Sequence, residues 1–209
     1  KYATAGPYGM PHYTDDKTLV VAAEDNPFWK SFIPLLEQLP AELATGIRNA
    51  YTTSDGSLSM MAFFDLLALH ELGHGFHLQG GLTMQRLWMQ ELFCNIMLHT
   101  YIAENEPQNL PALELFPEMV VSGGKNGYEY ITLSEFEDRY DRMDPKNYGW
   151  YQCRLHIAGK NIYNKGGVET FIKLWKGLLA NHEKMTDEQF ASFLNTRVHN
   201  EVAVVLTDW

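Results

Sequence analysis

The sequence is poor in cysteine, in basic side chains and in long apolar runs. Two cysteines among 209 residues, Cys94 and Cys153, are too few for a disulfide framework and have no CxxC spacing, so we expect buried free thiols. The 16 Lys and Arg residues against 26 Asp and Glu give a formal charge of −10, which argues against a nucleic-acid partner and against adhesion to an anionic membrane. No apolar run reaches the roughly 18 to 20 residues of a membrane span, so we expect a soluble chain.

The length and composition predict an ordinary globular domain. A chain of 209 residues that is 45% hydrophobic and 13% aromatic can bury one sizeable core. It begins at Lys1 without a methionine, so we expect a processed product or an expressed piece, with any signal peptide lying before residue 1. The sequence leaves the compartment open, secretion and the periplasm included, and it does not indicate an oligomeric state.

Strand signals are sparse and lie near the N-terminus, and helical signals follow them. The stretch KTLVVAAE (17–24) is β-branched and bounded by polar residues, which predicts a strand. The segments 26–39 and 40–51 have apolar residues at helical spacing, and the second begins with Pro40, a residue suited to a first helical turn. We therefore expect a mainly helical protein of the α+β class.

Two longer helices are predicted in the middle of the chain. The segment 58–78 is apolar nearly all round, which predicts one core helix, and Gly80-Gly81 is expected to end it. The next helix is expected at about 84–103, with Thr83 as its N-cap.

The second half of the chain is predicted to form further helices. Ser134 with Glu137, and Thr186 with Gln189, have the spacing of capping boxes, so each pair predicts a helix start. Gly166-Gly167 is expected to interrupt the helical pattern before residue 168.

The sequence HELGH places two histidines and a glutamate inside the helix predicted at 58–78. His70 and His74 are at i and i+4, so two imidazoles lie on one face and can converge on one point, with Glu71 on the adjoining edge. Zn²⁺ accepts imidazole nitrogens, and a catalytic zinc keeps a position for water, whose pKa it lowers towards about 7. A glutamate beside the metal can take the proton of that water. The pattern predicts one zinc ion per chain and Glu71 as general base.

The alternative is that the motif arose by chance. Its histidines would then be core residues bonded to backbone carbonyls, because a pattern with three fixed letters is common enough to occur without function. The surroundings of the motif favour a metal site over a chance occurrence. The motif lies on a predicted buried helix, and the following helix carries Glu91 and Asn95 at i and i+4 inside LWMQELFCNIML.

Glu91 is the best candidate for a third ligand. The metzincin pattern HExxHxxGxxH would need Gly at 77 and His at 80, whereas this chain has His77 and Gly80. His77 points round the helix away from the pair, which favours packing at the helix end or support of a ligand over ligation. After the Gly80-Gly81 turn the next helix can return past the first one and present Glu91 from its middle.

HELGH followed by WMQELFCN resembles the gluzincin zinc peptidases, the thermolysin-like group in which two His of HExxH and a Glu of the next helix hold the metal. The likeness is strongest over residues 66–97, and it is to the short, minigluzincin type. It implies one catalytic domain over 1–209. Residues from about 1 to 105 would form a small sheet edge, packed on the HExxH helix, and the metal-binding helices. Residues from about 106 to 209 would form a helical lobe that closes the cleft.

The same resemblance implies roles for further residues. Asn95 stands where these enzymes have an acidic residue, so its carbonyl is expected to accept the far N–H of a zinc-bound histidine. The stretch NYGWYQCRLH is similar to a helix on which a tyrosine faces the metal. Tyr148 matches best and would stabilise the oxyanion, with Tyr151 and His156 as alternatives. The alternative to a catalytic role is that this tyrosine is an aromatic side chain packed in the interface of the helical lobe.

The expected function is hydrolysis of peptide bonds, in a peptide or protein substrate, by zinc-activated water. Two alternatives stay open: a zinc hydrolase of a non-peptide amide, and a catalytically degenerate gluzincin-like module that binds protein. The intact Glu71 argues against the module, since a structural zinc usually has four protein ligands and no use for a base.

Overall fold

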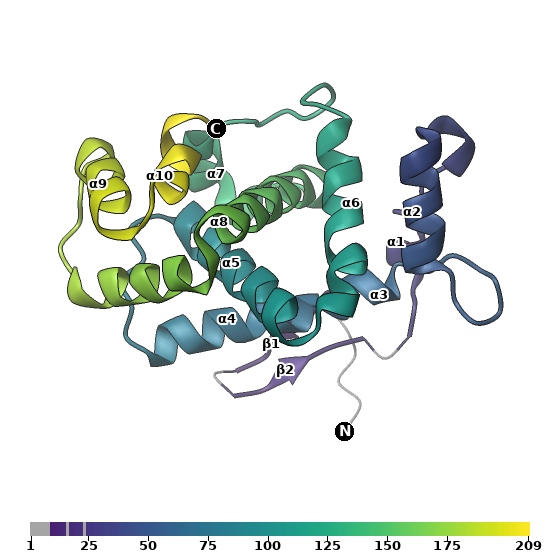
Figure 1. Cartoon of the computed structure of the whole chain (residues 1–209), viewed down its shortest axis with the longest axis horizontal. Helices are drawn as coiled ribbons and strands as arrows, with labels where there is room; N and C mark the ends of the chain where they lie inside the picture. Colours follow the sequence, from purple (N-terminus) through teal and green to yellow (C-terminus); the bar gives the residue numbers. More distant parts are fainter. Residues whose placement is uncertain (1–8, 16, 23) are drawn as a thin grey trace.

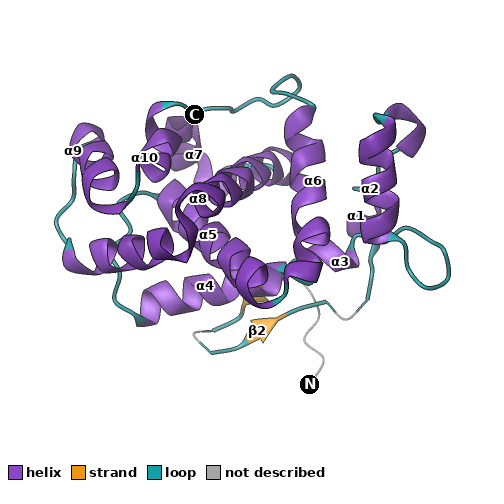
Figure 2. Cartoon of the chain, in the orientation of Figure 1, coloured by secondary structure: helices purple, strands orange, loops and turns teal. Residues whose placement is uncertain are grey.

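Helices make up most of this protein. The structure, a computed structural model, describes residues 9–15, 17–22 and 24–209. Helices account for 68% of the described residues, which also form a small antiparallel sheet of two strands (Figure 2). The expectation of a mainly helical protein with a small N-terminal sheet is confirmed. No helix among these residues is both long and apolar enough to cross a membrane.

The chain orders its elements with the sheet first and the longest helices in the middle. The N-terminal half contains β1 (His12–Tyr13), β2 (Leu19–Val20), α1 (Pro27–Lys30), the 3-10 turn η1 (Leu36–Gln38), α2 (Ala41–Tyr51), α3 (Met61–Phe64), α4 (Leu67–Gln79) and α5 (Leu87–Asn105). The C-terminal half contains η2 (Pro107–Asn109), α6 (Leu110–Ser122), α7 (Leu133–Arg139), η3 (Tyr140–Arg142), α8 (Pro145–Ala180), α9 (Asp187–Phe193), the π-helical turn η4 (Leu194–Val198) and α10 (Asn200–Thr207).

The core helix is α5, which lies between α4 and α8 (Figure 1). Of its 19 residues, 12 are buried. Glycines bring both neighbours close. A Cβ added to Gly73 of α4 would lie 3.0 Å from the Sγ of Cys94, and one added to Gly159 of α8 would lie 3.2 Å from the backbone of Asn95 and Ile96. Because neither glycine has a side chain, α4 and α8 pack directly against α5.

The segment 58–78 does not form one enclosed core helix, which corrects the prediction. A turn at residues 65–66 separates α3 from α4, and α4 lies at the surface. Its buried residues are His70, Gly73 and His77. Its exposed residues include three large apolar ones, Leu72, Phe76 and Leu78. Two histidines therefore face inwards while three large apolar side chains are exposed, although Leu67 and Leu69 pack against the core, so hydrophobicity alone did not identify the buried face of α4.

The two-stranded sheet lies against α4. Its strands pair antiparallel, with His12 opposite Val20 and Tyr13 opposite Leu19. A Cβ added to Gly75 of α4 would lie 2.9 Å from the hydroxyl oxygen of Tyr13. Glycine at this position of the helix therefore leaves room for β1, and the N-terminal strand borders the helix that carries the HELGH motif.

The predicted elements before α3 are partly right. The strand expected at 17–24 is limited to β2, and Ala23 lies outside the described residues. The segment 26–39 is not one helix, because Pro34 has no backbone N–H and divides it into α1 and η1. The prediction of a helix at 40–51 is confirmed by α2, with Pro40 as its N-cap residue.

The helix expected at 84–103 is confirmed, but its start is not where the sequence predicts it. It begins at Leu87, after Arg86 as N-cap residue, so Thr83 does not cap it. The Oγ1 atom of Thr83 instead lies 2.9 Å from Nδ1 of His182, in the turn that follows α8.

A capping box begins α7 two residues earlier than the sequence predicts. The spacing favours Ser134 with Glu137, whereas the structure pairs Thr132 with Glu135, each side chain accepting from the backbone N–H of the other. Glu137 instead accepts a hydrogen bond, at 2.9 Å, from the backbone N–H of Trp88 in the first turn of α5. Glu137 therefore makes a tertiary contact with α5 in place of the capping hydrogen bond that the sequence pattern predicts.

Other sequence predictions for the second half are confirmed. Thr186 and Gln189 form the capping box that begins α9. Gly167 has a φ of 60° and interrupts α8, in a backbone region that favours glycine. Cys94 and Cys153 are buried free thiols.

Replacement of Gly159 by alanine is expected to destabilise the protein. The added Cβ would press on the α5 backbone at Asn95 and Ile96, which cannot turn aside as a side chain can. We expect a loss of about 1–3 kcal/mol in the free energy of unfolding, measured by urea denaturation. Gly149→Ala on the same helix is the matched control, because a Cβ there meets nothing within 4 Å. It should leave stability unchanged or raise it by about 0.5–1 kcal/mol. Equal stabilities of the two variants would contradict the close contact of α8 with α5.

Candidate metal centre

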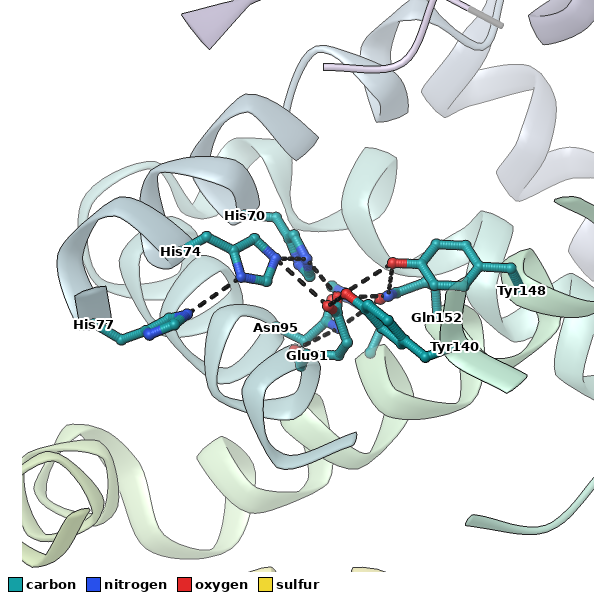
Figure 3. Close-up of polar contacts among 9 residues, drawn as sticks. His70, His74, His77, Glu91, Asn95, Tyr140, Tyr148 and Gln152 are labelled. Carbon is teal, nitrogen blue, oxygen red and sulfur yellow. Dashed lines mark hydrogen bonds and ion pairs between the residues drawn. The ribbon is translucent and has the colours of Figure 1, made fainter. Parts of the chain in front are cut away.

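The inward face of α4 and the second turn of α5 meet at three metal-ligand side chains. His70 and His74 lie one turn apart on α4, and Glu91 faces them from α5 (Figure 3). The side chain of Glu91 is 0% exposed, and those of His70 and His74 are 7% and 16% exposed. The structure therefore brings together the three residues that the sequence selects as metal ligands.

The spacing of their ligand atoms suits a tetrahedral ion. The Nε2 atoms of His70 and His74 are 3.2 Å apart. Glu91 approaches them with both oxygens, since Oε2 lies 3.1 Å from His70 Nε2 and Oε1 lies 3.6 Å from His74 Nε2. A tetrahedral ion with bonds of about 2.0–2.1 Å separates its ligand atoms by roughly 3.3–3.4 Å. The three groups can therefore hold one metal ion and leave a fourth position for water.

Charge interactions within this cluster favour an ionised carboxylate. Burial alone would raise the pKa of Glu91, but hydrogen bonds from His70 and His74 lower it well below its usual range. Burial alone would lower the pKa of His70, but the hydrogen bond and the charge of Glu91 raise it. An ionised carboxylate at this depth needs a positive partner, and a protonated imidazole or a bound cation can supply it.

Cys94 lies within reach of the same point. Its Sγ and one nitrogen each of His70 and His74 lie within 4.8 Å of one another, so these three residues also form a cluster that can hold a metal ion. A metal binds the thiolate form of cysteine. Burial, together with the charge of Glu91, raises the pKa of the Cys94 thiol well above its usual range. Glu91, whose oxygens lie within 3.6 Å of the Nε2 atoms of both histidines, and Cys94 are therefore the two candidates for the third ligand.

His77 contacts His74 and does not face the point of convergence. Its Nε2 lies 3.3 Å from His74 Nδ1, on the side of that ring away from Glu91 (Figure 3). Burial and the nearby His74 lower the pKa of His77 to about 4, so its ring is neutral and can accept the N–H of His74. With a hydrogen on Nδ1 of His74, this contact would leave the Nε2 lone pair of His74 for a metal.

Glu71 lies beside the cluster and faces a cleft. Its carboxylate makes no hydrogen bond with a described residue. Burial raises the pKa of Glu71, and the neighbouring His70 and His74 offset this only in part. Glu71 lines a cavity of about 110 Å³ together with His70, and a neighbouring cavity of about 460 Å³ that extends to His12 of β1. The free carboxylate therefore faces the space next to the candidate metal centre.

The walls of these two cavities are largely apolar. They are formed by side chains from the N-terminal segment, α1, α3 and α6 and from the start of α8. The large apolar ones are Met10, Phe28, Phe32, Phe63, Phe64, Leu67 at the start of α4, Phe116 and Met143. The polar side chains are gathered on the side of the metal cluster.

Three further side chains surround the carboxylate of Glu91. Tyr140 of η3 donates to Oε1, and Gln152 of α8 donates to Oε2 at 2.6 Å. The hydroxyl of Tyr148 lies 3.4 Å from the same Oε2 (Figure 3). Burial and the charge of Glu91 raise the pKa of both tyrosines, so their hydroxyls stay protonated.

Sequence reasoning selected Tyr148 and missed Tyr140 and Gln152. Gln152 follows Tyr148 by one helical turn, so the position i+4 on a helix already assigned to the site was a usable signal. Tyr140 lies in a short 3-10 turn, where no periodicity indicates which way a side chain points.

Two of the predicted alternatives lie away from the metal cluster. Tyr151 is buried, and its hydroxyl donates to the backbone carbonyl of Thr132 at 2.7 Å. His156 is also buried, and its Nδ1 lies 3.4 Å from Oδ1 of Asn95. Of the three candidates for an oxyanion donor, only Tyr148 contacts Glu91.

Asn95 makes its direct hydrogen bonds to other groups, but its side chain contributes, after burial and Glu91, to the pKa of His70, so the expected contact with a ligand histidine stays a prediction. The Oδ1 of Asn95 faces His156, and its Nδ2 donates to the backbone carbonyl of Glu91 at 3.0 Å and to Oε1 of Gln152 at 3.1 Å. The Nδ1 of His70 is buried without a hydrogen-bond partner. The direct hydrogen bonds of Asn95 therefore go to Glu91, Gln152 and His156.

Comparison with known proteins gives no relative for this chain. It matches no protein-family model, no curated protein and no solved structure. Inference about function therefore starts from the side chains of the candidate metal centre and from the cleft beside it.

Substitution of Glu91 and of Cys94 distinguishes the two possible ligand sets. Glu91→Gln keeps the size of the side chain but removes its charge. We expect it to reduce bound metal from about one equivalent to under about a tenth, measured by elemental analysis after incubation with Zn²⁺ and desalting. Cys94→Ala is the matched control on the same helix and should retain about one equivalent. Metal that is kept by the Glu91 variant and lost by the Cys94 variant would assign the cysteine as the ligand.

Proposed function

We propose that this protein is a zinc-dependent peptidase of the gluzincin type, which hydrolyses peptide bonds in a peptide or protein substrate. The observation that carries the proposal is the convergence of His70, His74 and Glu91 from two packed helices, with the free carboxylate of Glu71 beside them in a cleft. The resemblance of HELGH and WMQELFCN to the gluzincins supports the same chemistry.

The donor set fits zinc. Two imidazoles and one carboxylate are ligands of catalytic zinc sites. The Nε2 atoms of His70 and His74 lie 3.2 Å apart, a separation at which both lone pairs can bind one cation. Zinc bound there would polarise the substrate carbonyl and lower the pKa of a water molecule.

Glu71 is the residue that moves the proton. Its carboxylate accepts no hydrogen bond from residues 9–15, 17–22 or 24–209 and lines both cavities, so it can take a proton from the attacking water. The same group can return that proton to the amine nitrogen of the leaving peptide. The raised pKa of Glu71 favours this role, because a group that must both accept and release a proton is most effective when its pKa lies near the ambient pH.

Tyr148 is positioned to stabilise the charge that develops on the substrate carbonyl oxygen. It approaches from the side of Glu91 opposite the histidines and lines both cavities (Figure 3). Its hydroxyl stays protonated, since burial raises its pKa, and it can donate to an oxyanion. Tyr140 lines the larger cavity too, but its hydroxyl donates a hydrogen bond to Glu91.

The cleft suits an extended peptide with apolar side chains. The larger cavity is bordered by residues 10–12, at the start of β1, and its wall is rich in phenylalanine. A strand at the rim can pair with a peptide backbone, and apolar walls can hold alternate side chains. The substrate class that follows is a peptide segment in extended conformation.

Glu71→Gln is expected to abolish peptidase activity while leaving the metal in place. The amide keeps the size of the side chain but cannot accept the proton of water, so turnover should fall by at least about a hundredfold. Zinc content and thermal stability should stay close to those of the wild type. Cleavage of a mixed peptide library, followed by mass spectrometry, measures the activity without a known substrate.

His74→Ala is the contrasting variant. It removes one of three ligands, so zinc occupancy and thermal stability should fall together with activity. Cleavage that continues at the wild-type rate in Glu71→Gln would exclude the proposed role of this residue. A zinc-loaded wild type that cleaves no member of the library would favour a binding module instead of an enzyme.

A further inference from the structure

Behind the metal cluster, α5 and α8 face each other through a row of four polar side chains, three of them buried and one, Gln152, partly buried. On α5 these are Glu91 and Asn95, one turn apart, and on α8 they are Gln152 and His156, also one turn apart. Gly159 lets the α8 backbone lie directly against α5 beside Asn95, so the side chains are within hydrogen-bond distance across the interface. The interface between two packed helices is usually apolar, so four polar residues at matched spacing need an explanation.

The hydrogen bonds of this row all point in one direction. Gln152 donates its Nε2 to Oε2 of Glu91, at 2.6 Å. Asn95 donates its Nδ2 to Oε1 of Gln152, at 3.1 Å. His156 reaches Oδ1 of Asn95 with its Nδ1, at 3.4 Å, and a hydrogen on that nitrogen completes the series. Every donor in the chain from His156 to Glu91 therefore faces the carboxylate.

The negative charge of Glu91 explains this direction. An ionised carboxylate only accepts, so it fixes the amide of Gln152 with its nitrogen towards Glu91 and its oxygen towards Asn95. That oxygen then fixes the orientation of Asn95, whose own oxygen faces His156. Burial, with the nearby His99, lowers the pKa of His156 to about 3, so the ring is neutral and carries one hydrogen. Aligned hydrogen bonds of this kind polarise and strengthen one another.

We propose that Gln152 is a positioning residue for the metal ligand Glu91, held in place by the chain through Asn95 and His156. Gln152 also donates to the hydroxyl of Tyr148, at 2.7 Å, so one amide group holds both the ligand carboxylate and the oxyanion donor. Without it, the carboxylate would keep only Tyr140, Tyr148 and the histidines as partners and could rotate away from the metal position. This inference rests on the proposed zinc site.

Zinc affinity measured by competition with a chelator tests the proposal. Gln152→Leu keeps the shape of the side chain and removes the donor, and we expect zinc to bind about 10- to 100-fold more weakly. The visible absorption of the Co²⁺-substituted protein should change as well, because the geometry of the carboxylate ligand changes. His156→Phe should give a smaller loss in affinity, of about threefold, and His156→Gln, which keeps an N–H donor, should restore it.

Tyr151→Phe is the matched control. It removes a buried hydrogen bond from the neighbouring position of α8, but that bond goes to Thr132 and not towards Glu91. It should lower thermal stability and leave zinc affinity and the Co²⁺ spectrum unchanged. A Gln152→Leu protein with wild-type affinity and spectrum would overturn the positioning role alone. A wild type that fails to bind zinc would overturn the proposed function and this inference with it.

Discussion

The burial of the Glu91 carboxylate is the constraint on which the rest of the centre depends. The side chain is fully buried in the core helix, where an ionised group costs several kcal/mol unless it is paired and hydrogen-bonded. Three other elements supply partners: α4 two imidazoles, η3 a hydroxyl, and α8 an amide and a hydroxyl. The contacts that stabilise the buried carboxylate of Glu91 also orient it towards His70 and His74.

This constraint also accounts for the unusual surface of α4. The helix turns His70 and His77 inwards while Leu72 and Phe76 are exposed, an arrangement that burial of apolar area alone would reverse. Residues that break a local rule in this way tend to mark functional sites. In the proposed peptidase, His70 binds the metal and His77 orients the ligand His74. Glu71, on the adjoining edge of the helix, acts as general base towards the substrate.

The parts of the structure that follow from local sequence were predicted, and the parts that depend on distant packing were not. The HELGH helix and the placement of Glu91 follow from helical periodicity and from a short turn between consecutive helices. Tyr140 reaches Glu91 only because α7 and η3 fold back onto α5, which no local pattern encodes, whereas Gln152 could have been inferred from its position one turn after Tyr148. The start of α7 was misplaced because Thr132 and Ser134 both suit a cap, and tertiary contacts decided between them.

The central claim is that one zinc ion binds between α4 and α5. Anomalous X-ray diffraction from crystals of the zinc-loaded protein, recorded on both sides of the zinc absorption edge, tests it most directly. The account predicts one strong peak per chain, within about 2.0–2.2 Å of the Nε2 atoms of His70 and His74 and of an oxygen of Glu91. A peak bonded to the Sγ of Cys94 in place of Glu91, a peak elsewhere, or no peak at all would contradict it.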